Sequence, residues 1–282
     1  MSAALHVRLA HFYRTAFITG ASTGLGRAFA EMLLAEGVQV WGTSRDPARL
    51  APLREGARDA ARFHAVALDL RDGDAAVAAF EAAAQEAGGF DLVINNAGYG
   101  VFAEFTAVEF GIWQEQLEVM LVNTARLAHA ALGPMRARGR GALVNLSSLA
   151  AEFPLPFQSA YNMAKAGLTA LSESLMLEMA GTEIVILDVR PGDYRTDFEG
   201  SVRRPQTATS TRLDRAWAAF ERMMASGPEP AHAAAALRRA LVRRKSGTVR
   251  TGRFFQAVAA PLLTRLASLR LKRRIQAAYF DV

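Results

Sequence analysis

The chain has 282 residues, of which 51% are hydrophobic, so it can bury a large core as one α/β domain. It contains no cysteine, which excludes disulfides and thiolate metal sites, and we expect no metal. The net charge of +6 comes from 33 basic and 27 acidic residues, a modest excess without zinc-finger spacing or a basic motif interleaved with aromatics, which argues against nucleic-acid binding.

The N-terminus predicts neither export nor membrane insertion. Histidines and arginines interrupt the apolar residues of 1–14, so the segment lacks the apolar block of a signal peptide. No stretch reaches the roughly 18 uninterrupted apolar residues of a membrane-spanning helix. We therefore expect a cytoplasmic protein.

The first predicted unit is a strand, a glycine turn and a helix. Residues 15–19 form a short apolar run, Gly20, Gly24 and Gly26 follow, and a helical pattern continues through Glu36. Small residues at this spacing let the backbone approach a pyrophosphate at a helix N-terminus, where N–H groups are free. A second strand at 38–43 continues a mononucleotide-binding unit.

The residues after the second strand favour one cofactor. In dinucleotide-binding folds, an acidic residue about 20 positions after the glycines accepts hydrogen bonds from the adenosine ribose. Here that position holds Ser44, followed by Arg45. A carboxylate repels a 2′-phosphate, whereas serine and arginine bind one, so the sequence favours NADP(H) over NAD(H). The alternative is a surface arginine at the start of a turn.

The middle of the chain continues the alternation. Strands are predicted at 63–68, before Asp69 and Leu70, and at 91–94, and helices at 73–87 and 109–131. The fourth strand ends in Asn95-Asn96-Ala97-Gly98, which is either a plain turn or a ligand-binding turn at the carboxyl end of a strand. Asn123 lies inside the long helix, where asparagine is unfavourable, and indicates either a functional distortion or a solvent-facing side chain.

A candidate proton-transfer site follows. A strand at 141–147 precedes Ser148, a helix is predicted at 159–180, and a sixth strand at 183–189 precedes Pro191-Gly192. Four residues separate Tyr161 from Lys165, so the helix places phenol and ammonium on one face. We expect the ammonium to lower the pKa of Tyr161 toward neutral pH, which suits a general acid or base. The alternative is an ordinary helix pair.

The alternation of strands and helices predicts a doubly wound parallel sheet flanked by helices on both faces. We expect a single domain, 1–282. It comprises a dinucleotide-binding and catalytic core at 15–192, a substrate loop and helix at 193–228, and a C-terminal helical segment at 252–282.

Together these motifs resemble the classical short-chain dehydrogenase/reductase (SDR) family. The resemblance rests on residues 19–26 (TGASTGLG), 95–98 (NNAG), Asn123, Ser148, 161–165 (YNMAK) and 191–196 (PGDYRT), in this order and spacing. It covers most of residues 15–200 and implies a Rossmann-like fold. Ala164 stands where many relatives have serine, and the thirteen-residue spacing to Tyr161 favours Ser148 over Ser147.

The resemblance implies roles for these residues. Tyr161 exchanges a proton with the substrate oxygen while NADP(H) exchanges hydride with its carbon. Lys165 lowers the phenol pKa and binds the nicotinamide ribose, Ser148 holds the substrate oxygen, and Asn123 supports a proton-relaying water. The expected cofactor contacts are Gly20, Ser22, Thr23, Gly24, Leu25, Gly26, Ser44, Arg45, Asp69, Leu70, Asn96, Ala97, Gly98, Tyr161, Lys165, Pro191, Gly192 and Thr196.

We therefore expect an NADP(H)-dependent oxidoreductase acting on a hydrophobic ketone or secondary alcohol. Two segments near the site supply apolar side chains, which either line a pocket or belong to the core: Phe153, Leu155, Phe157, Tyr194, Phe198, Trp217, Phe220, Met223 and Met224. The loop also carries Arg195, Arg203, Arg204 and Arg212, which are compatible with an alternative function as a ketoacyl (acyl thioester) reductase. A non-catalytic dinucleotide-sensing protein is a third alternative.

The C-terminal segment is amphipathic and basic. Phe254, Phe255, Val258, Leu262, Leu266 and Leu269 recur at nearly helical spacing, and Arg265, Arg270, Lys272, Arg273 and Arg274 lie among and after them. Such a stretch lies on an anionic membrane, packs on its own domain or packs on another subunit. The family resemblance also implies a homodimer or homotetramer, built on the helices that contain Asn123 and Tyr161.

Overall fold

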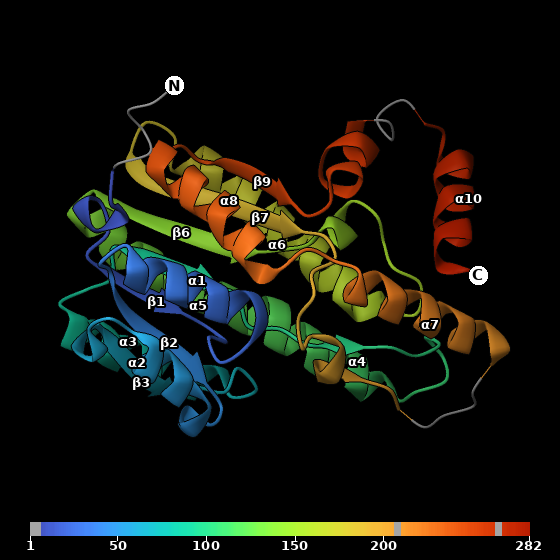
Figure 1. The fold of residues 1–282 in the computed structure, drawn as a ribbon, viewed down its shortest axis with the longest axis horizontal. Helices are drawn as coiled ribbons and strands as arrows, with labels where there is room; N and C mark the ends of the chain where they lie inside the picture. The colour runs from blue at the N-terminus through green and yellow to red at the C-terminus, as the bar shows by residue number, and fades with distance from the viewer. Residues whose placement is uncertain (1–6, 206–209, 263–266) are drawn as a thin grey trace.

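The computed structural model describes residues 7–205, 210–262 and 267–282, and it confirms the α/β prediction. Seven strands form one sheet in the order β3-β2-β1-β4-β6-β7-β9, and every neighbouring pair is parallel (Figure 1). The strands are β1 (Thr15–Ile18), β2 (Gln39–Ser44), β3 (Phe63–Ala67), β4 (Leu92–Asn95), β6 (Arg140–Leu146), β7 (Glu183–Pro191) and β9 (Gly247–Thr251). Two short strands, β5 (Gly100–Val101) and β8 (Val202–Arg203), pair separately.

Helices cover both faces of the sheet, as the alternation predicted. Apolar side chains of α1 and α8 pack on one face, and those of α3, α5 and α6 pack on the other (Figure 1). Both faces of a parallel sheet are thereby buried, which explains the nearly continuous apolar runs of its central strands. The α-helices are α1 (Gly24–Ala35), α2 (Ala51–Gly56), α3 (Gly73–Ala87), α4 (Phe110–Leu117), α5 (Asn123–Arg138), α6 (Ser159–Glu178), α7 (Thr211–Ala225), α8 (Pro230–Arg243) and α10 (Leu269–Phe280).

The helix predicted at 109–131 has different bounds and an interruption. A π-helical turn, Glu118–Val122, separates α4 from α5, and the Asn123 backbone N–H bonds to the Glu118 carbonyl, five residues back. The distortion that Asn123 indicated is therefore present directly before it. An extra residue in the turn changes which side chains face the sheet's carboxyl edge.

The last strand, β9, was not predicted. It lies beside β7, with Val249 opposite Val189, and its side chains are mostly half-buried because it is the edge of the sheet. A π-helical turn at Phe255–Ala259 and α10 follow it, so the 252–282 segment is helical in its described parts. Arg265 and Leu266 lie outside the described residues. Within the described ranges, no helix is both long and apolar enough to cross a membrane.

Exposed apolar side chains also lie on the helices expected to form an oligomer. Phe110 on α4, Val122 in the π-helical turn, and Met163 and Leu177 on α6 are all exposed. Burial of these side chains in a second copy would favour association. The homodimer or homotetramer stays a prediction.

Candidate active site

A cleft with a volume of about 760 Å³ opens where the strands end. It runs from the glycine turn after β1 to the loop after β7, the edge at which open parallel sheets collect ligands. Every residue expected to contact the cofactor lines it, as do Ser148, Tyr161 and Lys165. Asn123 is not among the lining residues.

The glycine turn leaves a tight hollow against the backbone. Gly20 and Gly24 have φ of +68° and +56°, which side chains with a Cβ rarely adopt. A Cβ on Gly26 would lie only 2.1 Å from the Gly20 carbonyl oxygen, so this helix position requires glycine. Thr23 precedes α1 without a side-chain capping bond, and the first N–H groups of the helix are therefore available to an anion.

The Asn96 side chain fixes the glycine turn in place. Its amide nitrogen donates to the carbonyls of Thr19 (2.9 Å) and Gly20 (3.0 Å), while Thr19 Oγ1 accepts from the Asn96 and Ala97 backbones. The Asn95-Asn96-Ala97-Gly98 turn is therefore more than a connection between elements. The hollow, the helix N-terminus and the long cleft together fit a dinucleotide with its pyrophosphate at Gly20–Gly26.

Basic side chains surround the end of the cleft that lies beyond β2 and β3. Arg45, Arg49 and Arg71 all line it, and no carboxylate stands at the end of β2. Arg71 pairs with Asp69 (2.5 Å) and holds the pKa of that carboxyl below its ordinary value. Arg45 and Arg49 form no ion pair with another described residue. The sequence interpretation identified Arg45 but missed Arg49, which the turn after β2 brings back to the cleft.

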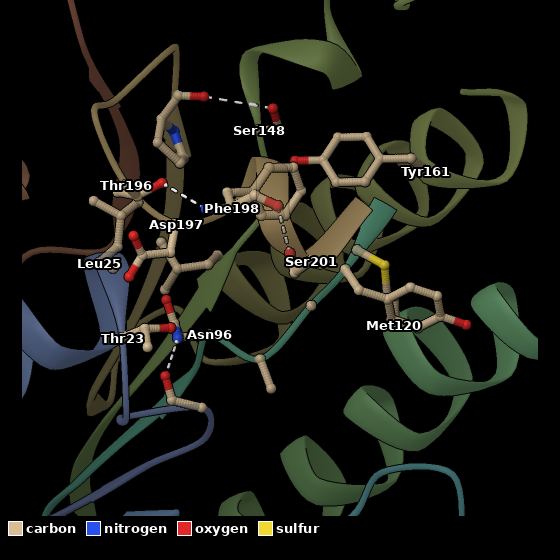
Figure 2. Close-up of a pocket in the computed structure, with 18 of the residues that line it drawn as sticks. Thr23, Leu25, Asn96, Met120, Ser148, Tyr161, Thr196, Asp197, Phe198 and Ser201 are labelled. Carbon is tan, nitrogen blue, oxygen red and sulfur yellow. Dashed lines mark hydrogen bonds between the residues drawn. The ribbon is translucent and has the colours of Figure 1, made fainter. Parts of the chain in front are cut away.

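The side chains of Ser148 and Tyr161 lie close together in the part of the cleft beyond the end of β6 (Figure 2). Ser148 follows β6, and its Oγ accepts a hydrogen bond from the Ala150 backbone at 3.0 Å and lies close enough to the Tyr161 hydroxyl to influence its pKa. Its contact to the Pro191 carbonyl, 3.4 Å, is long for a hydroxyl hydrogen bond. Ser147 also lines the cleft, but its hydroxyl donates to the buried Asp188 carboxylate, whereas the Ser148 hydroxyl lies beside Tyr161.

The expected lowering of the Tyr161 pKa does not occur in this structure. Burial raises the pKa of Tyr161 to about 12, Asp193 adds to the rise, and the Ser148 hydrogen bond opposes it. Lys165 Nζ lies 5.6 Å from the phenol ring centre and donates to the Leu146 carbonyl at 2.7 Å. Burial also lowers the pKa of Lys165 to about 8, against the attraction of Asp188. Spacing along the helix predicted the pair but could not predict this desolvation.

Met120 occupies the cleft position expected of Asn123. Asn123 lies about one helical turn after Met120. Its side chain is buried and donates to the Leu70 carbonyl at 2.8 Å. The Met120 side chain faces the cleft beside Gly98 (Figure 2). Asn123 therefore ties the distorted helix to the loop after β3, and its role in a proton relay stays a prediction. The π-helical turn produces this offset, and residue type alone could not reveal it.

The substrate end is only partly lined by the predicted apolar side chains. Leu155, Tyr194, Phe198, Phe220 and Met224 line the cleft. Phe157 and Trp217 pack instead with Phe102 in a small core, and neither Phe153 nor Met223 lines the cleft. Of the four loop arginines only Arg203 lines it, and Arg203 pairs with Glu115 at 3.1 Å.

Asp193 was not predicted as a site residue. It lines the cleft, accepts a hydrogen bond from Gln256 at 2.5 Å, and interacts with Tyr279. Burial raises the pKa of its carboxyl. The partners of Asp193 are more than 60 residues away along the chain, so only folding brings them together.

A buried ion network supports the floor of the site. Arg190 is buried and pairs with Asp188 (2.7 Å), Glu152 (2.7 Å) and Glu173 (2.8 Å). Asp188, which is fully buried, also accepts the hydrogen bond from Ser147. The network therefore joins the ends of β6 and β7, from which Ser148 and Pro191 project.

Comparisons with known proteins agree with this geometry. The family model described as short chain dehydrogenase matches residues 14–207. An uncharacterized oxidoreductase of Myxococcus xanthus is 34% identical over 194 residues, which cover 68% of this chain and 77% of that protein. A 3-ketodihydrosphingosine reductase of Bacteroides thetaiotaomicron is 32% identical over 184 residues, 64% of each chain.

Solved structures extend the similarity to nearly the whole chain. A short-chain dehydrogenase from Streptomyces avermitilis has a TM-score of 0.80 at 30% identity, covering 93% of this chain and 96% of that one. A short-chain dehydrogenase/reductase from Burkholderia phymatum in complex with NAD has a TM-score of 0.79 at 25% identity, covering 90% and 92%. The chain belongs to the short-chain dehydrogenase/reductase family of oxidoreductases.

Proposed function

We propose that the protein is an NADP(H)-dependent oxidoreductase that interconverts an apolar ketone and a secondary alcohol, with Tyr161 as general acid and base. The observation that carries the proposal is the Ser148–Tyr161 hydroxyl pair at the cleft, with the buried Lys165 one turn along α6. A dinucleotide held at Gly20–Gly26 supplies the hydride. The residues of the chain supply position, polarisation and the proton.

In ketone reduction, the two hydroxyls hold the substrate oxygen. The long Ser148 contact to Pro191 leaves the Ser148 proton free to turn toward that oxygen and stabilise its developing charge. Tyr161 then gives its proton to the oxygen. The ammonium form of Lys165, whose Nζ lies 5.6 Å from the phenol ring centre, opposes the effect of burial by favouring the phenolate that remains.

Two features support NADP(H) rather than NAD(H). Ser44 stands where a carboxylate would repel a 2′-phosphate, and Arg45 and Arg49 line the same end of the cleft and form no ion pair with another described residue. The related structure in complex with NAD is only 25% identical, so cofactor choice depends on this chain's own residues.

The lining of the substrate end supports an apolar substrate. Leu155, Phe198, Phe220 and Met224 contribute apolar surface, and a 3-ketodihydrosphingosine reductase among the relatives is consistent with an apolar substrate. Arg195, Arg203 and Arg204 are each paired with a carboxylate, which leaves them poorly suited to an acyl-carrier phosphate. This argues against the ketoacyl thioester alternative.

The test is NADPH oxidation by the purified protein with apolar ketones and ketoacyl thioesters, and with NADH in parallel. Tyr161→Phe is expected to lower turnover at least about 100-fold without changing NADPH affinity, because it removes only the transferable proton. Tyr13→Phe is the matched control, since its buried hydroxyl donates to the Leu241 carbonyl of α8 and Tyr13 does not line the cleft. Substantial activity of Tyr161→Phe would refute the assigned role, and turnover of thioesters alone would favour the alternative substrate.

A further inference from the structure

The net charge of the protein is concentrated at one end of the chain. Residues 252–282 contain six of the 33 basic residues and one of the 27 acidic residues, so the preceding 251 residues are nearly balanced. The single acidic residue, Asp281, lies at the very end. Arg270, Lys272, Arg273 and Arg274 form no ion pair with another described residue.

The same segment carries most of the exposed apolar side chains. Among the residues that the structure describes, eight of the thirteen large exposed hydrophobic side chains lie between residues 254 and 279. They are Phe254, Phe255, Val258, Leu262, Leu269, Leu271, Ile275 and Tyr279, and Phe254 is 75% exposed. Large exposed apolar side chains gathered in one segment are typical of a surface that contacts another molecule. We call these residues, with Arg270, Arg273 and Arg274, the C-terminal surface.

The two sides of α10 differ. One side faces the domain: Phe280 is buried, Gln276 donates to the Pro154 carbonyl at 3.1 Å, and the helix packs beside α7 (Figure 1). On the other side, Leu271 and Ile275 lie one turn apart, and Arg270 and Arg274 lie one turn apart beside them. An apolar pair flanked by long basic side chains suits the boundary between lipid headgroups and acyl chains.

The C-terminal surface adjoins the opening of the cleft. Gln256, in the π-helical turn after β9, bonds both to Asp193 on the cleft wall and to Tyr279 on α10 (3.0 Å). Pro154, which α10 contacts through Gln276, adjoins the cleft-lining Leu155. A flat partner that covered the C-terminal surface would therefore lie next to the substrate end.

We propose that the C-terminal surface docks on a bilayer containing anionic lipid and brings the cleft to the membrane. The excess of basic charge favours an anionic surface over a second copy of this chain, whose own C-terminal surface would repel it. Docking on the bilayer does not depend on the proposed function. The uptake of an apolar substrate from the bilayer does rest on the proposed function.

The test is co-sedimentation of the full chain with vesicles of phosphatidylcholine alone or mixed with phosphatidylglycerol. The wild type is expected to bind the mixed vesicles and to release as salt increases, because salt screens the attraction. Arg270→Glu with Arg274→Glu is expected to weaken binding at least about 25-fold, since each basic residue near an anionic membrane contributes about fivefold. Leu271→Gln with Ile275→Gln is expected to weaken binding at least about tenfold by removing buried apolar area.

The matched control is Arg54→Glu with Arg58→Glu, an exposed arginine pair at the same spacing near α2. It is expected to bind mixed vesicles like the wild type, and all variants are expected to keep wild-type NADPH affinity and melting temperature.

Failure of the wild type to bind mixed vesicles, or an equal loss of binding in the control variant, would overturn the proposal. A smaller oligomer in the Leu271 and Ile275 variant, with vesicle binding unchanged, would overturn it too and identify a second copy as the occupant. NADPH oxidation without vesicle binding would leave the proposed function standing and refute only the docking.

Discussion

Gly26 is the position where the smallest chemical change should disturb the cofactor cradle most. In Gly26→Ala the new methyl would lie 2.1 Å from the Gly20 carbonyl oxygen and 3.0 Å from the Gly20 carbonyl carbon. Both are backbone atoms, and the Asn96 amide, 2.4 Å from the methyl, is itself held by its 3.0 Å hydrogen bond to that carbonyl, so relief requires more than the movement of one free side chain. The glycine turn itself must shift.

The expected cost follows from that geometry. Overpacking of this kind costs about 1–3 kcal/mol, which corresponds to about 5-fold to 150-fold if it appears in cofactor affinity. We expect NADPH affinity, measured by fluorescence titration, to fall within that range, together with a lower melting temperature. Gly133→Ala is the control, because nothing lies within 4 Å of the added methyl on α5 and alanine favours a helix.

Two results would refute this reasoning. Unchanged melting temperature and NADPH affinity would mean that the turn accommodates a Cβ and that the close packing at Gly26 has no energetic consequence. A lower melting temperature with unchanged NADPH affinity would mean that the turn is tightly packed but does not hold the pyrophosphate. Gly133→Ala should bind NADPH like the wild type in either case.

Three further predictions concern charged groups. Arg45→Asp should shift preference from NADPH toward NADH in parallel rate measurements, because a carboxylate repels the 2′-phosphate; an unchanged ratio would place that phosphate elsewhere. Burial lowers the pKa of Lys165 from 10.5 to about 8, so between these pH values the folded state binds fewer protons than the unfolded state. In urea unfolding, the wild type should therefore gain stability relative to Lys165→Met as the pH rises from about 8 to 10.5. Parallel pH profiles of the two proteins would contradict the lowered pKa. Arg190→Met should lower the free energy of unfolding by about 3–5 kcal/mol, because it leaves the fully buried Asp188 carboxylate without its ion pair. Arg244→Met, which removes an exposed ion pair, should lower it by less than about 1 kcal/mol. Equal effects of the two substitutions would refute a special contribution of the buried pair.

Much of the candidate site could be predicted because local sequence determines it. The turn at Gly20–Gly26 needs residues without a Cβ, and this requirement is visible as glycines at fixed spacing. Ser44 and Arg45 follow β2 directly, and Tyr161 and Lys165 share one helix, so each relation spans only a few residues. Apolar runs alternating with helical patterns likewise predicted the parallel sheet, with β9 missed because an edge strand buries too little to leave an apolar run.

The remaining features depend on contacts between distant segments. The π-helical turn moves Met120 to the cleft and Asn123 away from it, because the extra residue in that turn offsets the helix face. The pKa of Tyr161 rises because folding removes water around it, an effect that helix spacing does not encode. The sequence alone determined the chemistry available at each strand end and the basic, apolar character of the C-terminus. Only the tertiary structure decided which side chains meet in the cleft and which face of α10 stays exposed, because burial and desolvation arise when separate elements pack together.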